Sequence, residues 1–146
     1  MTGQLQGKRG LIMGVANERS IAWGIAKSMS DEGAELAFTY QGEAFASRLA
    51  PLASSVGSDL LFELDVADDA SFETTFGSLS GHWNSLDFIV HAIAYSDKNE
   101  LTGRFLNTTR ENFKNTLDIS SYSLIEVARR AYPLMMEKGG TILTLT

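Results

Sequence analysis

Short apolar runs alternate along the chain with longer stretches in which apolar residues recur every three or four positions. The short runs are typical of buried parallel strands, and the longer stretches are typical of amphipathic helices. This alternation predicts repeated strand-helix-strand units and an α/β fold with a parallel sheet. The predicted strands span residues 11–13, 36–40, 60–66, 88–90 and 141–146.

The first predicted helix follows the first strand after a short turn. It begins at Ser20 and ends at Gly33, a residue type common just after a helix. One face of this helix carries Ile21, Ile25 and Met29, four residues apart, with Ala22 and Ala26 beside them, and this face is therefore expected to be the apolar one.

Later helices are predicted from similar stripes. Phe72, Phe76, Leu79 and Trp83 mark one helix, which Asp68 or Asp69 is placed to cap. The capping-box pattern Thr108-x-x-Glu111 opens a second, long helix. Pro133 should kink or break that helix, because proline lacks the N–H that an interior helical position donates.

Length and composition are those of one globular domain. The 146 residues predict a single domain over 1–146, and the sequence stops inside the fifth predicted strand, so we expect the natural protein to continue. The net charge of -6 argues against nucleic-acid binding. With no cysteine and two histidines, no metal site is expected. No signal or membrane-spanning segment is visible, which predicts a cytoplasmic protein without a membrane partner.

The strongest candidate for chemistry is the turn between the first strand and the first helix. Gly14 ends the strand and allows a sharp turn, and Ser20 starts the helix, whose free N–H groups suit a pyrophosphate. The Ser20 hydroxyl can cap the helix or donate to a phosphate oxygen. An ordinary turn between a strand and a helix explains the same residues, because the usual G-x-G-x-x-G pattern is absent.

Three residues at the ends of the second and third strands are further candidates. Gln41 lies where a dinucleotide fold meets the adenosine ribose, and its neutral side chain favours NAD over NADP. Asp65 and Val66 lie where an adenine ring would be placed, although Asp65 is equally suited to cap the next turn.

The end of the fourth strand is the expected ligand-binding point of an open α/β sheet. His91 is there, either as a buried strand residue, which we prefer, or as a base. Residues 94–107 form a polar stretch long enough to be a functional loop. Residues 118–123 are unusually polar for the inward face of a helix, and are expected either to line the site or to hydrogen-bond to the adjacent loops. Neither the G-x-S-x-G pattern of hydrolases nor the GK[ST] of P-loops is present.

Taken together, these segments resemble the short-chain dehydrogenase/reductase superfamily, and within it the bacterial NADH-dependent enoyl-acyl-carrier-protein reductases. The segments that carry the resemblance span the chain: Gly14-Val15-Ala16-x-x-x-Ser20-Ile21-Ala22-x-Gly24, residues 32–41, Asp65-Val66-Ala67, His91-Ala92-Ile93 and residues 118–123. The resemblance implies a Rossmann-like doubly wound parallel sheet in the order 3-2-1-4-5, incomplete at its C-terminal end.

The resemblance also implies roles for individual residues. The cofactor NAD (NADH) would contact Gly14, Ser20, Ile21, Gln41, Asp65, Val66 and Ile93, and the substrate would contact Ser96. Relatives usually carry Gly-Phe-Ala-Pro where residues 94–97 read Ala-Tyr-Ser-Asp, so the shape of the acyl pocket departs from the family pattern. The family's catalytic Tyr and Lys are expected beyond Thr146, so no catalytic residue is assigned here.

The implied activity is NADH-dependent reduction of the trans-2 double bond of an enoyl thioester carried on acyl carrier protein, during fatty-acid elongation. The implied assembly is a homotetramer. Two alternatives stay open on the sequence: a ketoacyl reductase or other member of the same superfamily, and a nucleotide-binding module without turnover.

Overall fold

The computed structural model describes residues 3–146, which form one five-stranded parallel sheet in the order β3-β2-β1-β4-β5. The predicted strand order is therefore confirmed. The strands are β1 (Arg9–Met13), β2 (Glu35–Tyr40), β3 (Leu61–Glu63), β4 (Phe88–His91) and β5 (Thr141–Thr144). β1 lies at the centre, where Leu11 pairs with Ala37 of β2 and with Ile89 of β4.

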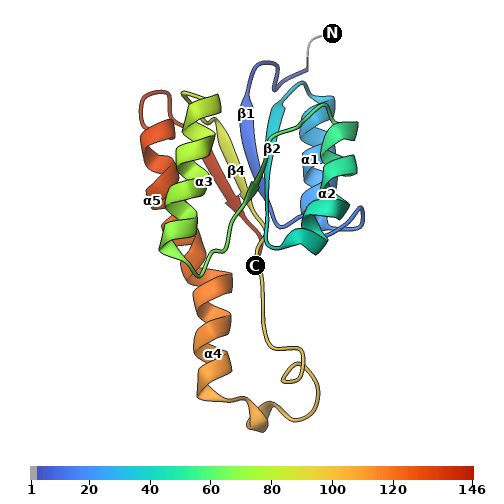
Figure 1. The fold of residues 1–146 in the computed structure, drawn as a ribbon, viewed down its shortest axis with the longest axis vertical. Coiled ribbons are helices and arrows are strands. Elements are labelled where there is room, and N and C mark those ends of the chain that lie inside the picture. Colours follow the sequence, from blue (N-terminus) through green and yellow to red (C-terminus); the bar gives the residue numbers. More distant parts are fainter. Residues whose placement is uncertain (1–2) are drawn as a thin grey trace.

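Helices cover both faces of the sheet, as Figure 1 shows. α1 (Ile21–Asp31) and α2 (Glu43–Ser55) lie on one face, and α3 (Asp69–His82) and α5 (Ser123–Met135) lie on the other. Each face of the sheet packs against its helices through a separate apolar core. One core contains Trp23 and Phe38, and the other contains Phe72 and Ile89. The sheet is thus buried on both faces, which explains why its strands read as continuous apolar runs.

The predicted face of α1 is confirmed at Ala22 and Ala26 but not at Ile21. Ala22, Trp23 and Ala26 are buried, whereas Ile21 is 70% exposed. Ile25 and Met29 only border the core. The reason is geometric: the small side chains of Ala22 and Ala26 let the helix approach β1 and β2 closely, and Ile21 then lies on the exposed side.

The long predicted helix is divided into three helical segments. α4 (Arg110–Leu117) leads into a π-helical turn, η2 (Asp118–Tyr122), and then into α5. The N-cap of α4 is Thr109 and not Thr108, because the Thr109 hydroxyl accepts the N–H of Asn112 at 3.1 Å. A short 3-10 helix, η1 (Phe105–Asn107), precedes it.

Pro133 does not break α5, contrary to the sequence prediction, and the helix continues to Met135. Val127, Ala131 and Met135 are buried at intervals of four residues, so packing against the sheet holds the helix together past the proline.

The third and fifth strands are shorter than predicted. β3 ends at Glu63 because its partner β2 ends at Tyr40, the residue with which Glu63 pairs. Leu64 and Val66 then turn into the core, and Asp65 lies in the loop after the strand. β5 ends at Thr144, opposite His91 of β4.

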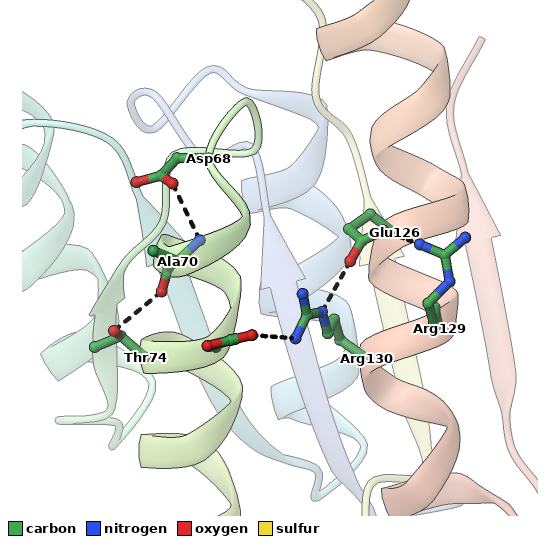
Figure 2. Close-up of polar contacts among 7 residues, drawn as sticks. Asp68, Ala70, Thr74, Glu126, Arg129 and Arg130 are labelled. Carbon is green, nitrogen blue, oxygen red and sulfur yellow. Dashed lines mark hydrogen bonds and ion pairs between the residues drawn. The ribbon is translucent and has the colours of Figure 1, made fainter.

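An ion-pair cluster fixes α5 to α3 (Figure 2). The buried carboxylate of Glu126 accepts from Arg129 and, at 2.8 Å, from Arg130 Nε. The hydrogen bond from Arg130 lowers the pKa of Glu126, followed by the charges of both arginines. Arg130 also reaches Glu73 on α3 at 3.5 Å.

Asp68 caps α3, as one of the two predicted candidates, because its carboxylate accepts the N–H of Ala70 at 3.0 Å.

α4 and the loop before it extend beyond the sheet at the carboxyl ends of the strands, the lower end of the molecule in Figure 1. Among the helices of residues 3–146, none has the length and apolar character that crossing a bilayer requires.

Candidate functional site

The turn between β1 and α1 is shaped by Gly14. Its φ of +100° lies in the region that favours glycine, and a Cβ there would lie 1.9 Å from the Ala92 carbonyl oxygen. Gly14 therefore serves two purposes: it reverses the chain after β1 and it lets the turn contact the end of β4 directly. Its main function in the fold is this backbone contact.

Ser20 is the N-cap of α1, but its side chain makes no cap hydrogen bond. Its Oγ instead accepts the N–H groups of Ala16 at 2.9 Å and Asn17 at 3.1 Å, closing the loop on itself. Within residues 3–146 the structure gives no acceptor for the Ser20 hydroxyl proton. Two accepted hydrogen bonds polarise this O–H group, so it is a ready donor to an anion.

The first turn of α1 offers two further donors. Trp23 and Gly24 donate to the Ser20 carbonyl, whereas the N–H groups of Ile21 and Ala22 have no partner among the described residues. These two N–H groups and the Ser20 hydroxyl lie together at the positive end of the helix dipole. The arrangement can hold a phosphate group.

A cavity of about 240 Å³ lies at the carboxyl ends of β1, β2 and β4. Four of the seven predicted cofactor residues line it: Gly14, Gln41, Val66 and Ile93. The rest of its wall comes from Val15, Ala16, Thr39, Tyr40, Phe45, Leu64, Ala92, Ala94, Tyr95 and Ile119. The cavity thus combines an apolar interior with a polar rim, which suits a flat heterocycle attached to a sugar.

The rim at the end of β2 contains Gln41 and Phe45. Gln41 is exposed, and Phe45, on the first turn of α2, is half-exposed. The guanidinium of Arg48 lies over the Phe45 ring, 5.8 Å from its centre. Arg48 therefore helps to hold Phe45 at the cavity wall. Residues three apart on a helix lie on the same side, so the sequence could have indicated this contact.

Asp65 and Val66 occupy the loop after β3. The Asp65 carboxylate accepts the N–H of Ala67 at 2.9 Å, so one of its oxygens supports the turn, as the alternative interpretation expected. Val66 is buried and lines the cavity, whereas Asp65 does not line it. The Val66 N–H has no partner among the described residues, and is free to donate to a ligand.

Ser96 lies in the loop after β4 and is held against α4. Its Oγ accepts from Asn112 Nδ2 at 3.1 Å and lies 3.0 Å from the Thr116 hydroxyl. The neighbouring Asp97 N–H donates to the same Asn112 side chain at 3.1 Å. Ser96 is thus a fixed point of the loop, and it is separate from the wall of the cavity that Gly14 and Gln41 share.

His91, the last residue of β4, is fully buried and does not line the cavity. Its Nδ1 lies 3.0 Å from the Thr144 hydroxyl, and its Nε2 lies 2.8 Å from the Ser123 hydroxyl. Burial lowers the pKa of His91, partly offset by a backbone hydrogen bond. The preferred interpretation, a buried strand histidine with satisfied ring nitrogens, therefore fits the structure.

Several residues of the wall were not predicted from the sequence. Tyr95 and Ile119 are far apart along the chain, and they meet because Ser120 Oγ binds both the N–H and the carbonyl of Tyr95, at 2.9 and 3.1 Å. Polar residues 118–123 were expected to line the site or bond the adjacent loop. Ile119 does the first, and Ser120 does the second.

Comparison with known proteins places the chain among enoyl reductases. The family described as "Enoyl-(Acyl carrier protein) reductase" matches residues 14–146. The chain is 58% identical over its whole length to "Enoyl-[acyl-carrier-protein] reductase [NADH] 2" of Rhizobium meliloti, and covers 54% of that protein. It is 51% identical to "Enoyl-[acyl-carrier-protein] reductase [NADH] FabI" of Rickettsia typhi, over 99% of this chain and 55% of that one.

Solved structures agree with this similarity. The structure of FabI from Candidatus Liberibacter asiaticus matches with a TM-score of 0.96 and 52% identity, over 100% of this chain and 56% of that chain. A reductase from Anaplasma phagocytophilum, solved in complex with NAD, matches with a TM-score of 0.94 and 49% identity, over 100% and 55% of the two chains. The chain thus spans about half the length of the relatives that it matches.

Proposed function

The chain belongs to the enoyl-(acyl carrier protein) reductase family, and we propose that the whole protein uses NADH to reduce the trans-2 double bond of enoyl thioesters in fatty-acid elongation. The observation that carries the proposal is the cavity at the strand ends, where Gly14, Gln41, Val66 and Ile93 meet. Relatives named NADH-dependent reductases cover the whole of this chain, and a similar structure was solved with NAD.

The residues present fit a dinucleotide. The Ser20 hydroxyl and the N–H groups of Ile21 and Ala22 would hold the pyrophosphate, because three donors at a helix N-terminus match phosphate oxygens. Gly14 carries no side chain that would obstruct the approach to this turn.

The two ends of the dinucleotide would lie along the cavity wall. Gln41 would face the adenosine ribose, and its neutral amide suits the ribose hydroxyls of NADH. Val66 N–H and the free oxygen of Asp65 would contact adenine, and Ile93 would pack on the inner ribose. Residues 1–146 would then act as one dinucleotide-binding unit. Bound NADH supplies a hydride, and the residues named here bind and orient it.

The substrate side is proposed to lie at the loop after β4. The Ser96 side chain is held by Asn112 and Thr116, and the Ser96 backbone would contact an enoyl group carried on acyl carrier protein. The Tyr and Lys that complete the chemistry in this family are proposed to come from outside residues 1–146. The Tyr would stabilise the developing enolate, and the Lys would support the nicotinamide ribose.

Self-association as a homotetramer in the cytoplasm completes the proposal. Large apolar side chains remain exposed along α4, η2 and α5, which is typical of surfaces that bind another protein. They are Phe113, Leu117, Tyr122, Ile125, Tyr132 and Met136, here called the α4–α5 face.

The reaction is tested by mixing the whole protein with NADH and a short trans-2-enoyl thioester and following absorbance of NADH. The proposal expects NADH to be consumed only when both are present, and a saturated thioester serves as the control. Absence of NADH consumption would contradict the activity. Reduction of a 3-ketoacyl thioester in its place would favour the ketoacyl reductase alternative.

A further inference from the structure

His91 joins three elements behind the cavity wall. It ends β4, its ring contacts Thr144 at the end of β5, and it contacts Ser123 at the start of α5. The contact with Ser123 is fully buried, and the contact with Thr144 is partly buried. The imidazole, itself fully buried, is therefore fixed on both sides by hydroxyl groups.

The hydrogen bonds determine which nitrogen carries the proton. The Ser123 hydroxyl donates to the Ile119 carbonyl at 2.6 Å, and a serine has a single hydroxyl proton. The Ser123 oxygen must then accept from His91, so Nε2 bears the hydrogen. Nδ1 of the neutral ring has a lone pair, which accepts from the Thr144 hydroxyl at 3.0 Å. Burial, which lowers the pKa of His91, agrees with a neutral ring.

The chain of hydrogen bonds ends on the wall of the cavity. The Ile119 carbonyl belongs to the π-helical turn η2, and Ile119 lines the same cavity as Ile93. The next residue, Ser120, holds the backbone of Tyr95, which also lines the cavity. A shift of η2 would thus move two parts of the wall at once. π-helical turns are uncommon and are frequent at functional sites.

We propose that His91 is a positioning residue: as a neutral imidazole protonated on Nε2, it fixes Ser123 and thereby η2, which sets the inner end of the cofactor cavity. The inference rests on the proposed function, because it assigns the cavity end at Ile93 and Ile119 to the reacting side of the cofactor. His91 itself touches neither cofactor nor substrate, so it acts through Ser123.

The protonation state is tested first, and this measurement needs no activity. In the whole protein labelled with ¹⁵N-histidine, the His91 resonances are identified by their loss in His91→Gln. The proposal expects a protonated Nε2 and an unprotonated Nδ1 at pH 7. A proton on Nδ1, or an imidazolium ring at this pH, would overturn it.

The coupling to the cavity wall is tested with three variants. Ser123→Ala and His91→Leu break the hydrogen-bond chain, and His91→Gln keeps a donor near the position of Nε2. Ser80→Ala is the matched control, because the Ser80 hydroxyl also donates to a helical carbonyl, that of Gly77, but faces solvent. In the free protein, the Ile119 methyl resonance should move in the first two variants and remain in the control. An unchanged resonance in Ser123→Ala would overturn the proposal even if His91→Leu fails to fold.

Turnover separates positioning from simple loss of folded protein. Turnover per NADH-binding site should fall roughly tenfold in Ser123→Ala and in His91→Leu, and should fall less in His91→Gln, because small displacements near a reacting group reduce rates strongly. A purely structural role would reduce the number of NADH-binding sites and leave turnover per site unchanged, which would contradict the proposal. If the wild-type protein consumes no NADH, the proposed function fails, while the tautomer and the Ile119 resonance still decide the role of His91.

Discussion

Gly14 and Ala92 approach so closely that a Cβ on Gly14 would lie 1.9 Å from the Ala92 carbonyl oxygen. Gly14→Ala should therefore destabilise the protein by at least about 1–3 kcal/mol, the cost of holding a side chain at an unfavourable φ, with the clash added. Urea denaturation of the variant measures the loss.

Gly24→Ala is the matched control for this substitution. Gly24 lies in α1, a few residues away, and a Cβ there meets no atom within 4 Å. Since alanine favours a helix, this variant should gain about 0.5–1 kcal/mol in its free energy of unfolding. Equal effects of the two substitutions would contradict the role given to the Gly14–Ala92 contact.

Ser20→Asp should weaken the binding of NADH. A carboxylate would replace a hydroxyl donor at the end of α1, and would repel the pyrophosphate. The dissociation constant should rise at least tenfold, equivalent to about 1.4 kcal/mol. Titration of NADH by fluorescence measures it, and Ser28→Asp, on the exposed side of the same helix, should leave it within about twofold. An unchanged constant in Ser20→Asp would exclude the phosphate role.

The lowered pKa of His91 predicts that stability falls in mild acid. The unfolded chain takes up a proton near the ordinary pKa of 6.5, whereas the folded protein resists it because the ring is buried. The contribution of His91 is thus complete above pH 6.5 and is lost as the pH falls toward the pKa of the folded state. Urea denaturation between pH 7.5 and 5.5 should show a decline that is absent in His91→Gln. If the free energy of unfolding changed with pH equally in the two proteins, the contribution assigned to His91 would be refuted.

If the α4–α5 face forms the tetramer interface, a charge introduced on this face should dissociate the tetramer. Ile125 is 54% exposed within this chain, so Ile125→Lys removes little packing inside the subunit. The wild-type protein should elute as a tetramer in size-exclusion chromatography with light scattering, and the variant as a smaller species. Lys114→Glu, a charge change on α4 outside the apolar set, should leave the mass unchanged. A tetrameric Ile125→Lys protein would show that this face is not the interface.

The layers and strand order could be predicted from the sequence because they depend on periodic apolar positions. The ends of the elements could not, because they depend on partners. β3 stops where β2 stops, at the pairing of Glu63 with Tyr40. α5 continues through Pro133 because Met135 is buried in the core. Both are tertiary effects that local sequence preference does not contain.

In the candidate site, too, some residues could be predicted from the sequence and others could not. Gly14, Gln41, Val66 and Ile93 all follow a strand, so strand prediction alone brings them to one edge of the sheet. Ile119 could not be found in this way. It reaches the cavity through a π-helical turn, and no pattern in residues 118–122 distinguishes such a turn from an α-helix.

The central claim is that the cavity at the carboxyl ends of β1, β2 and β4 holds NADH. Methyl NMR of the isoleucine-labelled whole protein tests it most directly, with each resonance assigned by an isoleucine-to-valine substitution. On addition of NADH, the Ile93 and Ile119 methyl resonances should shift. The resonance of Ile25, which lies on α1 against the core and does not line the cavity, should stay in place. Saturation with NADH that leaves Ile93 and Ile119 unshifted would contradict the account.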